Sequence, residues 1–464
     1  MKRLLIVAVS VCLTLALSQT CAAQASSPAG VNDKSAQVDA LMSSLIRDDA
    51  PGAAVLVIQN GQVVHSKGYG LAQLETKERV TPGTAFELAS TSKQFTAMAV
   101  MMLAERGRLS LDDPLSKFFT GFPPYAKKIT VRHLLDHTSG LVDIINPQWF
   151  KKGYEPTSKD LLKQMARQSN VSFAPGERFE YNNAGYMLLA LVVEKASGQA
   201  FARFMKENIF APLDMRSTFI YDESKPKTTR VAASYALIEN NFKAFETTSD
   251  RFVYGAKGVI STLDDLVKWE HALETEKLVK AATLKEAFTS GKLNNGMATL
   301  YGFGWYVNQE NGLDVFEHAG GYLGYRATVR RYPSARTTIF LLSNNATIEP
   351  TPLARKIAEI YLAGQMKQPV GMKLDVQLLK EYVGKYEGDP AVMPNLLIDI
   401  TLENEELYIT SPIKPKTKLL AQSESLFVIA DTASNVTFNR DEKGAVNGLT
   451  LTTRRGTVRA HKLK

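Results

Sequence analysis

Residues 87–105 read ELASTSKQFTAMAVMMLAE, and this stretch governs how the rest of the chain is interpreted. From Gln94 onward nearly every residue is apolar, which predicts a helix buried on most sides and ended by Gly107. Ser90 then lies in the first turn, and Lys93 follows on the same face. The helix dipole and unpaired backbone N–H groups favour a polarised hydroxyl there. A buried lysine beside it can free a lone pair for the hydroxyl proton, so the pattern predicts a serine nucleophile with a lysine partner.

The Ser-x-x-Lys spacing by itself is weak evidence, because it occurs three times in the chain. The other two copies, Ser224–Lys227 and Ser411–Lys414, each contain a proline and cannot open a regular buried helix. On this motif alone a structural interpretation stays open, with Ser90 as a helix cap and Lys93 in solvent.

The first 25 residues have the features of a secretory signal. Lys2 and Arg3 precede an apolar stretch from Leu4 to Leu17, and Ala23-Gln24-Ala25 is a small-residue cleavage site. The apolar stretch is shorter than the ~20 residues of a membrane span, so we expect a secreted or periplasmic protein with no stable span after signal removal. Both cysteines lie in this segment, so we expect no disulfide and no thiolate metal site in the mature chain.

The composition is globular and gives no case for nucleic-acid binding. The formal net charge is +8 and falls to +6 when the two basic signal residues are removed, with no dense basic run. The length exceeds that of one ordinary domain. Residues 364–372, with Pro369 and Gly371, have the composition of a linker. We therefore expect a larger domain over residues 26–363 and a small one over residues 373–464.

Periodicity indicates how these domains are built. We expect helices over 37–47, 94–105, 129–139, 157–168, 184–196, 263–273 and 352–363, and strands over 53–59, 62–69, 301–308, 325–332 and 337–343. Residues 221–258 are polar and predict an irregular surface excursion. Strand sequence at both ends with helices between predicts an α+β fold, in which an antiparallel sheet built from both ends is flanked by helices and carries an inserted helical lobe. In the tail, short alternating strands predict a small all-β barrel or sandwich.

His133 and His137 stand four residues apart in the helix expected over 129–139. That spacing can bind a metal from one helix face. No glutamate or third ligand occupies a supporting position, so helix packing and capping are favoured over a metal site.

Two further stretches strengthen the serine interpretation. The loop PGERFEYNNAGY, residues 175–186, delivers Tyr181 and Asn183 just before a helix. A tyrosinate whose pKa is lowered by a nearby lysine can act as a general base, and the Asn183 amide can hold a substrate amide. In EHAGGYLGY, residues 317–325, glycines after His318 would let a substrate lie close to a strand edge. Singly, Tyr181 could be a core aromatic and His318 a surface turn residue.

The ordered set Ser90-x-x-Lys93, Tyr181-x-Asn183 and His318-x-Gly320 resembles that of the penicillin-recognising serine hydrolases. This family includes class C β-lactamases, D-Ala-D-Ala carboxypeptidases, D-aminopeptidases and related esterases. The resemblance covers roughly residues 37–363, and the tail from residue 373 resembles the lipocalin-like β-domain appended to some members. It implies a β-lactamase/transpeptidase-like fold and a serine hydrolase without a cofactor.

The resemblance also implies roles for the motif residues. Ser90 would be the acylated nucleophile, and Lys93 and Tyr181 would share proton transfer. The N–H groups of Ser90 and Gly321 would form the oxyanion hole, with Gly320 allowing the close approach.

Substrate recognition would fall to Asn183, on the substrate amide, and to His318, which would face a substrate carboxylate or tune Tyr181. Class C β-lactamases typically have Lys-Thr-Gly where this chain has His318-Ala319-Gly320. A histidine is only partly charged near neutral pH, so a peptidase or esterase role is favoured over β-lactamase activity. The substrates expected are small amides, esters or peptides, a class that includes cell-wall-derived peptides. The competing interpretation is a non-catalytic, penicillin-binding-like sensor or binding protein, but the expected nucleophile, lysine and tyrosine are all present.

Overall fold

The structure is a computed structural model, and the part of the chain that it describes has several gaps. The described residues are 29–143, 158–220, 230–245, 254–367, 371–388, 396–412, 414–430, 434–453 and 456–463. The expected signal segment and Ser224–Lys227 lie outside them. Among the described helices, none is long and apolar enough to cross a membrane.

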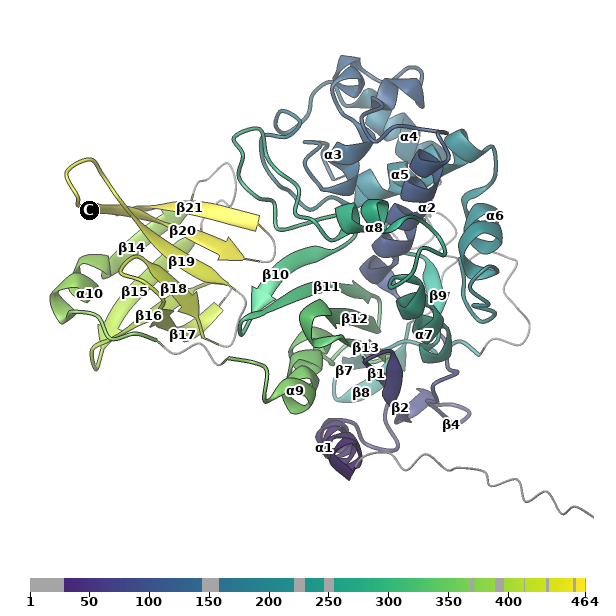
Figure 1. The fold of residues 1–464 in the computed structure, drawn as a ribbon, viewed down its shortest axis with the longest axis horizontal. Helices are drawn as coiled ribbons and strands as arrows, with labels where there is room; N and C mark the ends of the chain where they lie inside the picture. The colour runs from purple at the N-terminus through teal and green to yellow at the C-terminus, as the bar shows by residue number, and fades with distance from the viewer. Residues whose placement is uncertain are drawn as a thin grey trace, which may run out of the picture.

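Six antiparallel strands form the central sheet, in the order β10-β11-β12-β13-β1-β2 (Figure 1). They are β1 (Ala53–Gln59), β2 (Gln62–Tyr69), β10 (Tyr306–Glu310), β11 (Leu313–Tyr322), β12 (Tyr325–Tyr332) and β13 (Thr337–Ser343). Strand β1 pairs with β13 through Val55 and Leu341, so segments from the two ends of the larger domain meet in the middle of the sheet. The α+β fold expected from the sequence, with one sheet built from both ends, is therefore confirmed.

Side chains of the sheet alternate between two cores, because successive residues of a strand point to opposite faces. Val55 and Val57 pack with α1 (Ala29–Leu45) and α9 (Pro350–Leu362). Leu56 and Ile58 belong to the other core, which includes α2 (Lys93–Glu105), α7 (Leu263–Ala272) and α8 (Ala281–Ala287). The sheet is thus covered by helices on both faces, and α2 is enclosed between the sheet and the helical lobe.

The inserted lobe lies at the top of Figure 1. It contains η2 (Leu115–Lys117), η3 (Pro124–Lys127), α3 (Val131–Leu135), α4 (Ser158–Arg167), α5 (Asn183–Ser197), α6 (Phe201–Met205) and the π-helical turn η5 (Lys206–Phe210). Helix α5 begins where the Asn182 side chain accepts a hydrogen bond from the Gly185 N–H at 2.8 Å, and it ends at Gly198, whose φ is +75°. These are a common N-terminal cap and a common C-terminal cap. The N-terminal cap fixes the start of α5, which lies beside α2.

Small strands connect the sheet to the lobe. They are β3 (Leu71–Gln73), β4 (Glu78–Arg79), β5 (Phe86–Glu87), β6 (Phe219–Ile220) and β9 (Val259–Ser261), with the turn η6 (Pro333–Ala335) between β12 and β13. Strand β9 pairs with both β5 and β6. This pairing holds the start of the Ser90 stretch against residues 259–261.

The irregular surface excursion expected over 221–258 is only partly confirmed for the residues that the structure describes, since β7 (Tyr235–Ile238) and β8 (Asn241–Ala244) are mostly exposed but regular and residues 255–256 are buried. Strands β7 and β8 form a hairpin. Residues 254–258 pack against α2, where Thr96 Oγ1 donates to the Gly255 carbonyl at 2.9 Å. Gly255 and Ala256 are buried, a long-range contact that polarity along the sequence does not reveal.

The helix expected over 129–139 ends at Leu135 instead of Gly140. His133 lies in its first turn, in a capping box with Thr130, whereas His137 has a φ of +59° and lies beyond the helix. The two histidines therefore do not share one helix face. In the described part of the chain, no group of three His, Cys, Asp or Glu side chains is placed to hold a metal.

The strand expected over 301–308 has different bounds in the structure. Strand β10 begins only at Tyr306, and Tyr301 makes an isolated bridge to it, because Gly304 between them has a φ of +83°. The sequence predicts a strand edge at His318 and the glycines after it, but it sets no bounds for strand β11. In the structure both glycines are inside the strand.

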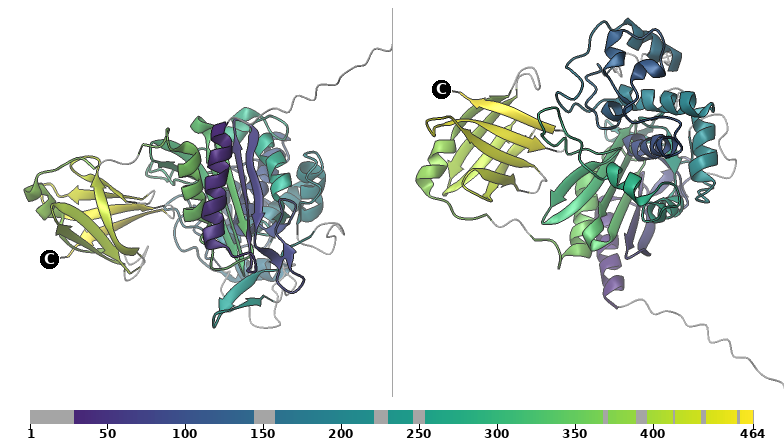
Figure 2. Two further views of the ribbon diagram at one scale, coloured as in Figure 1. Left: turned by 90° about the horizontal axis from the view of Figure 1, so that it is seen from below. Right: turned by 45° about the horizontal axis from the view of Figure 1, so that its top comes forward.

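The tail folds into a closed eight-stranded barrel, because its first strand pairs with its last. It contains α10 (Val376–Tyr382), β14 (Gly384–Gly388), β15 (Leu397–Glu403), β16 (Glu406–Ser411), β17 (Lys414–Ala421), β18 (Leu426–Ile429), β19 (Asn435–Arg440), β20 (Val446–Thr453) and β21 (Gly456–Lys462). Tyr382 stacks on Phe438 inside a separate apolar core. Figure 2 shows the barrel to one side of the larger domain. Of the barrel and the sandwich that the sequence allowed, the barrel forms.

Candidate active site

Ser90 lies in a tight turn that is held from two directions. The turn is η1 (Ala89–Ser92), a 3-10 helix that runs directly into α2, so Ser90 stands just before the α-helix instead of in its first turn. Ala89 has a φ of +47°, which is uncommon for a residue other than glycine. Glu87 Oε1 accepts hydrogen bonds from the Ala89 N–H at 3.1 Å and from the Gly258 N–H at 2.8 Å. The Glu87 carboxylate thus ties the Ser90 turn to the loop 254–258.

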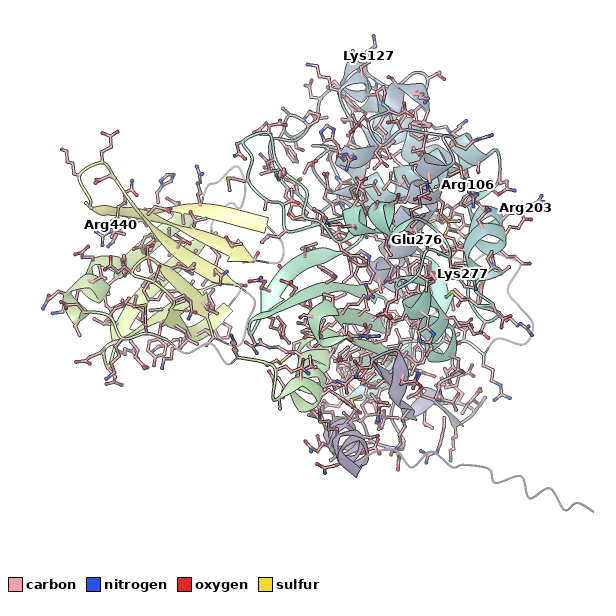
Figure 3. The ribbon with its side chains drawn as sticks, viewed as in Figure 1. Arg106, Lys127, Arg203, Glu276, Lys277 and Arg440 are labelled. Carbon is pink, nitrogen blue, oxygen red and sulfur yellow. The ribbon has the colours of Figure 1, made fainter. Side chains whose placement is uncertain are left out.

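Lys93 is completely buried at the start of α2. Its Nζ donates to Asn183 Oδ1 at 2.9 Å and to the Ala256 carbonyl at 3.0 Å. Burial lowers the pKa of Lys93 to about 7, against an opposing effect from the Asp143 carboxylate. The amine is therefore neutral in a large fraction of molecules at neutral pH. By contrast, the labelled surface cations Lys127 and Arg203 project outward in Figure 3.

Tyr181 lies beside the nucleophile candidate, because the Ser90 hydroxyl is close enough to oppose the rise in the pKa of its phenol. The Lys93 Nζ lies 4.7 Å from the centre of the Tyr181 ring. Burial, reinforced by Tyr306, raises the pKa of Tyr181 well above its usual value. The phenol is therefore protonated at neutral pH, whereas the sequence suggested a tyrosinate with a lowered pKa.

Asn183 is the first residue of α5 and bridges Lys93 to an acidic side chain. While its Oδ1 accepts from Lys93, its backbone N–H and Nδ2 donate to Asp143 Oδ2 at 3.1 and 3.3 Å. The Asp143 carboxylate also lies at the N-terminus of α5, where the helix dipole favours a negative charge.

His318 is buried in β11 with both ring nitrogens engaged. Its Nδ1 lies 2.8 Å from the Ala319 carbonyl, which can only accept, so Nδ1 carries the proton and donates. Nε2 then accepts from the Tyr301 hydroxyl at 3.1 Å. Burial, followed by the effect of Lys93, lowers the pKa of His318 to about 3. A neutral, enclosed imidazole brings no positive charge to a carboxylate.

Strand β11 passes directly over the Ser90 turn at its glycines. A Cβ added at Gly320 would lie 2.4 Å from the Leu88 carbonyl oxygen and 2.8 Å from the Ser90 nitrogen, so no larger residue fits. A Cβ added at Gly321 would meet only the Arg326 side chain, at 3.6 Å. The structure therefore brings Ser90, together with the Lys93, Tyr181 and Asn183 side chains and β11, into one site.

Comparison with known proteins identifies the family of the chain. Residues 36–362 match the protein family described as Beta-lactamase. The chain belongs to the beta-lactamase family. Over 416 residues it is 31% identical to Penicillin-binding protein 4* of Bacillus subtilis (strain 168), an alignment that covers 84% of this chain and 90% of that protein.

Solved structures of related proteins share the fold. The octameric penicillin-binding protein homologue from Pyrococcus abyssi superposes with a TM-score of 0.63 at 23% identity, covering 92% of this chain and 99% of that chain. The D-amino acid amidase from Ochrobactrum anthropi SV3 superposes with a TM-score of 0.60 at 21% identity, covering 72% of this chain and 99% of that chain. The first of these matches extends over the barrel as well as the family domain.

The sequence of this beta-lactamase family member did not identify several residues that lie around the site. The His137 ring lies 4.4 Å from that of Tyr181 and 4.6 Å from that of Tyr301, and its Nδ1 accepts the Asn182 N–H at 3.1 Å. The Tyr306 ring stacks parallel to that of Tyr181, with ring centres 6.4 Å apart. The pattern of residues 129–141, which predicts a helix, could have drawn attention to His137. No local pattern could have identified Tyr301 or Asp143, because neither residue belongs to one of the motifs.

Proposed function

We propose that this chain is a secreted serine hydrolase that forms an acyl-enzyme on Ser90, with small amides, esters or peptides as substrates. The observation that carries this proposal is the placement of Tyr181 beside the Ser90 hydroxyl and 4.7 Å from the Nζ of the fully buried Lys93. A polarised hydroxyl with a neutral amine and a protonated phenol at hand is an arrangement for nucleophilic attack and proton return.

The base is Lys93. A neutral lysine amine has two N–H groups and one lone pair, and Asn183 Oδ1 and the Ala256 carbonyl occupy the two donors. The lone pair then accepts the Ser90 proton as the Oγ attacks the substrate carbonyl. The Ser90 and Gly321 N–H groups stabilise the oxyanion, since Gly320 lets β11 approach the turn.

Tyr181 acts as the acid. Its phenol donates a proton to the leaving group as the bond to the carbonyl carbon breaks, and Lys93 returns the serine proton to the phenolate. The net result is transfer of the Ser90 proton to the leaving group, and a water attack in the reverse sense releases the acyl group. The raised pKa of Tyr181 suits a proton donor better than a resting base.

A peptidase or esterase activity is favoured over β-lactamase activity. The neutral His318 offers no charge for a β-lactam carboxylate at the position where class C β-lactamases typically carry a lysine. The solved relatives include a D-amino acid amidase, which supports an amide substrate. Cell-wall-derived peptides belong to the same chemical class. Asn183 would hold the substrate amide.

The test is covalent labelling with a fluorophosphonate and with a fluorescent penicillin, read by intact mass. Wild type should gain one adduct, and Ser90→Ala should gain none. Ser411→Ala is the matched control, since Ser411 belongs to another Ser-x-x-Lys copy, in β16 of the barrel, and it should label like wild type. Labelling without turnover of any ester or amide would favour the sensor, and no labelling at all would overturn the proposal.

Export is a separate part of the proposal and rests on residues 1–25. Expression of the full chain in a bacterial host should yield a mature N-terminus at residue 26 in the periplasmic fraction, determined by N-terminal sequencing. An unprocessed chain in the cytoplasm would contradict it.

A further inference from the structure

His137 holds the chain on both sides of Tyr181. It lies just beyond α3 and is only 1% exposed. Its backbone carbonyl accepts the Glu180 N–H at 2.9 Å, and its ring Nδ1 accepts the Asn182 N–H at 3.1 Å. The residues directly before and after Tyr181 are therefore both tied to one histidine.

The ring chemistry of His137 follows from the bond to Asn182. A backbone N–H can only donate, so Nδ1 carries the lone pair and Nε2 carries the proton. In the described part of the chain Nε2 meets no hydrogen-bond partner. Burial, followed by the effect of Lys93, lowers the pKa of His137 well below its usual value. The imidazole is thus neutral near pH 7, and its polar contact with the site is the one through Nδ1.

The same ring also packs against the phenol. The ring centres of His137 and Tyr181 lie 4.4 Å apart, and Tyr186 and Tyr301 surround the imidazole at 5.0 and 4.6 Å. The Tyr181 hydroxyl lies beside Ser90, at the other end of the phenol from its backbone. Its place at Ser90 therefore depends on a backbone and a ring that His137 holds together.

Stability alone does not favour a histidine at this position. Its φ is +59°, in the left-handed region where glycine or asparagine usually follows a helix. Its buried Nε2–H also has no partner among the described residues, which is unfavourable for folding. Strained residues of this kind persist where the surrounding structure holds them for a functional reason.

We propose that His137 is a positioning residue for the proton donor: its carbonyl, its Nδ1 and its ring together hold the Tyr181 phenol where it can protonate the leaving group. The inference rests on the proposed function and adds a residue that acts through Tyr181. Small displacements of a proton donor have large effects on rate, so loss of these contacts should slow the substrates that most need the proton.

The experiment compares two esters with the same acetyl group, 4-nitrophenyl acetate and 4-methoxyphenyl acetate. The 4-nitrophenolate leaves without a proton, whereas the more basic 4-methoxyphenolate gains from one. The measured quantity is the ratio of kcat/KM for the methoxy ester to kcat/KM for the nitro ester. This ratio does not depend on the folded fraction of a variant, because the same active molecules react with both esters.

His137→Gln should lower the ratio by about tenfold to a hundredfold, because its amide reaches the place of Nε2 and leaves the Asn182 N–H without its acceptor. His137→Asn should retain most of the ratio, since its Oδ1 takes the place of Nδ1 and asparagine tolerates a positive φ. In a Tyr181→Phe background, His137→Gln should cause no further selective fall, because its effect passes through the missing hydroxyl.

His133→Gln is the matched control. It makes the same substitution at the histidine that caps α3 with Thr130, and it should leave the ratio unchanged. An equal loss on both esters in His137→Gln would overturn this inference while leaving the acyl-enzyme intact, and so would a selective fall that persists without the Tyr181 hydroxyl. Failure of either ester to acylate Ser90 in wild type, read by intact mass, would instead overturn the proposed function, and this inference with it.

Discussion

At the scale of single residues, the protonation states of the site follow from burial. Lys93 is buried and Tyr181 is half-buried, and desolvation favours the neutral form of each group. A neutral amine can take a proton and a neutral phenol can give one. Burial thus assigns the two roles that the sequence left shared between Lys93 and Tyr181.

The first residue-scale prediction concerns pH. Because the neutral amine of Lys93 is the form that accepts the serine proton, kcat/KM for a neutral ester should rise about tenfold per pH unit below the Lys93 pKa of about 7 and level off above it. A pH series from 5 to 9 measures this. Lys93→Arg, whose charge persists throughout, should lose about 10²–10⁴-fold of kcat at every pH. A flat wild-type profile would mean that Lys93 is not the base.

A second prediction concerns Tyr181→Phe. The variant keeps the ring against His137 but loses the hydroxyl that lies beside Ser90. We expect kcat to fall by about 10²–10⁴-fold, with a smaller change in KM, since the missing proton donor acts in the transition state. Steady-state kinetics with an amide substrate, which has the poorer leaving group, is the sensitive measurement. An undiminished kcat would assign the proton transfers to Lys93 alone.

At the scale of secondary-structure elements, the site depends on how closely β11 lies against the Ser90 turn. Gly320→Ala places a methyl group against backbone that cannot move aside, so we expect a loss of about 1–3 kcal/mol in unfolding free energy and of most Ser90 labelling. Gly321→Ala, one residue along, meets only a flexible side chain and should stay within about 1 kcal/mol. Chemical denaturation and adduct mass test both. Equal effects at the two positions would contradict the close approach.

The same strands carry a buried ion network. The Arg330 guanidinium in β12 pairs with the Glu317 and Glu310 carboxylates on β11 and β10, and all three side chains are almost fully buried. Arg330→Met leaves two buried carboxylates without their main cation, so we expect a loss of about 3–5 kcal/mol in unfolding free energy. Arg79→Met, which removes an exposed pair with Asp48, should change it by less than about 1 kcal/mol. Urea denaturation of both variants checks the difference, and similar midpoints would contradict it.

At the scale of the whole molecule, the barrel has its own core and closes on itself. The larger domain holds the chain as far as Lys367, whose N–H donates to the Asn311 carbonyl at 2.8 Å, and Met366 is buried in that domain. The barrel holds it again from Met372, whose N–H donates to the Ala421 carbonyl at 3.0 Å. We therefore propose that the linker begins a few residues after Gly364, the residue at which the sequence predicts its start.

A chain that ends at Lys367 should therefore fold, and its Ser90 should react with the fluorophosphonate label. Its substrate range should change if the barrel borders the active site. Size-exclusion chromatography and adduct mass measure this. The full-length protein is the control. A soluble, monodisperse product that does not label would mean that the barrel belongs to the site, and aggregation would mean that it covers an apolar face of the larger domain.

Local sequence by itself determined the elements whose signals lie within a few residues of each other. The β1–β2 hairpin, α2, α5 and the three motifs were predictable because periodicity, caps and turns act over one or two turns of chain. Tertiary structure alone decided that loop 254–258 meets Lys93, that Asp143 reaches Asn183, and that the environment favours the neutral forms of Lys93 and Tyr181. Those features come from burial and from contacts between residues far apart in the chain, and a local pattern carries no measure of either.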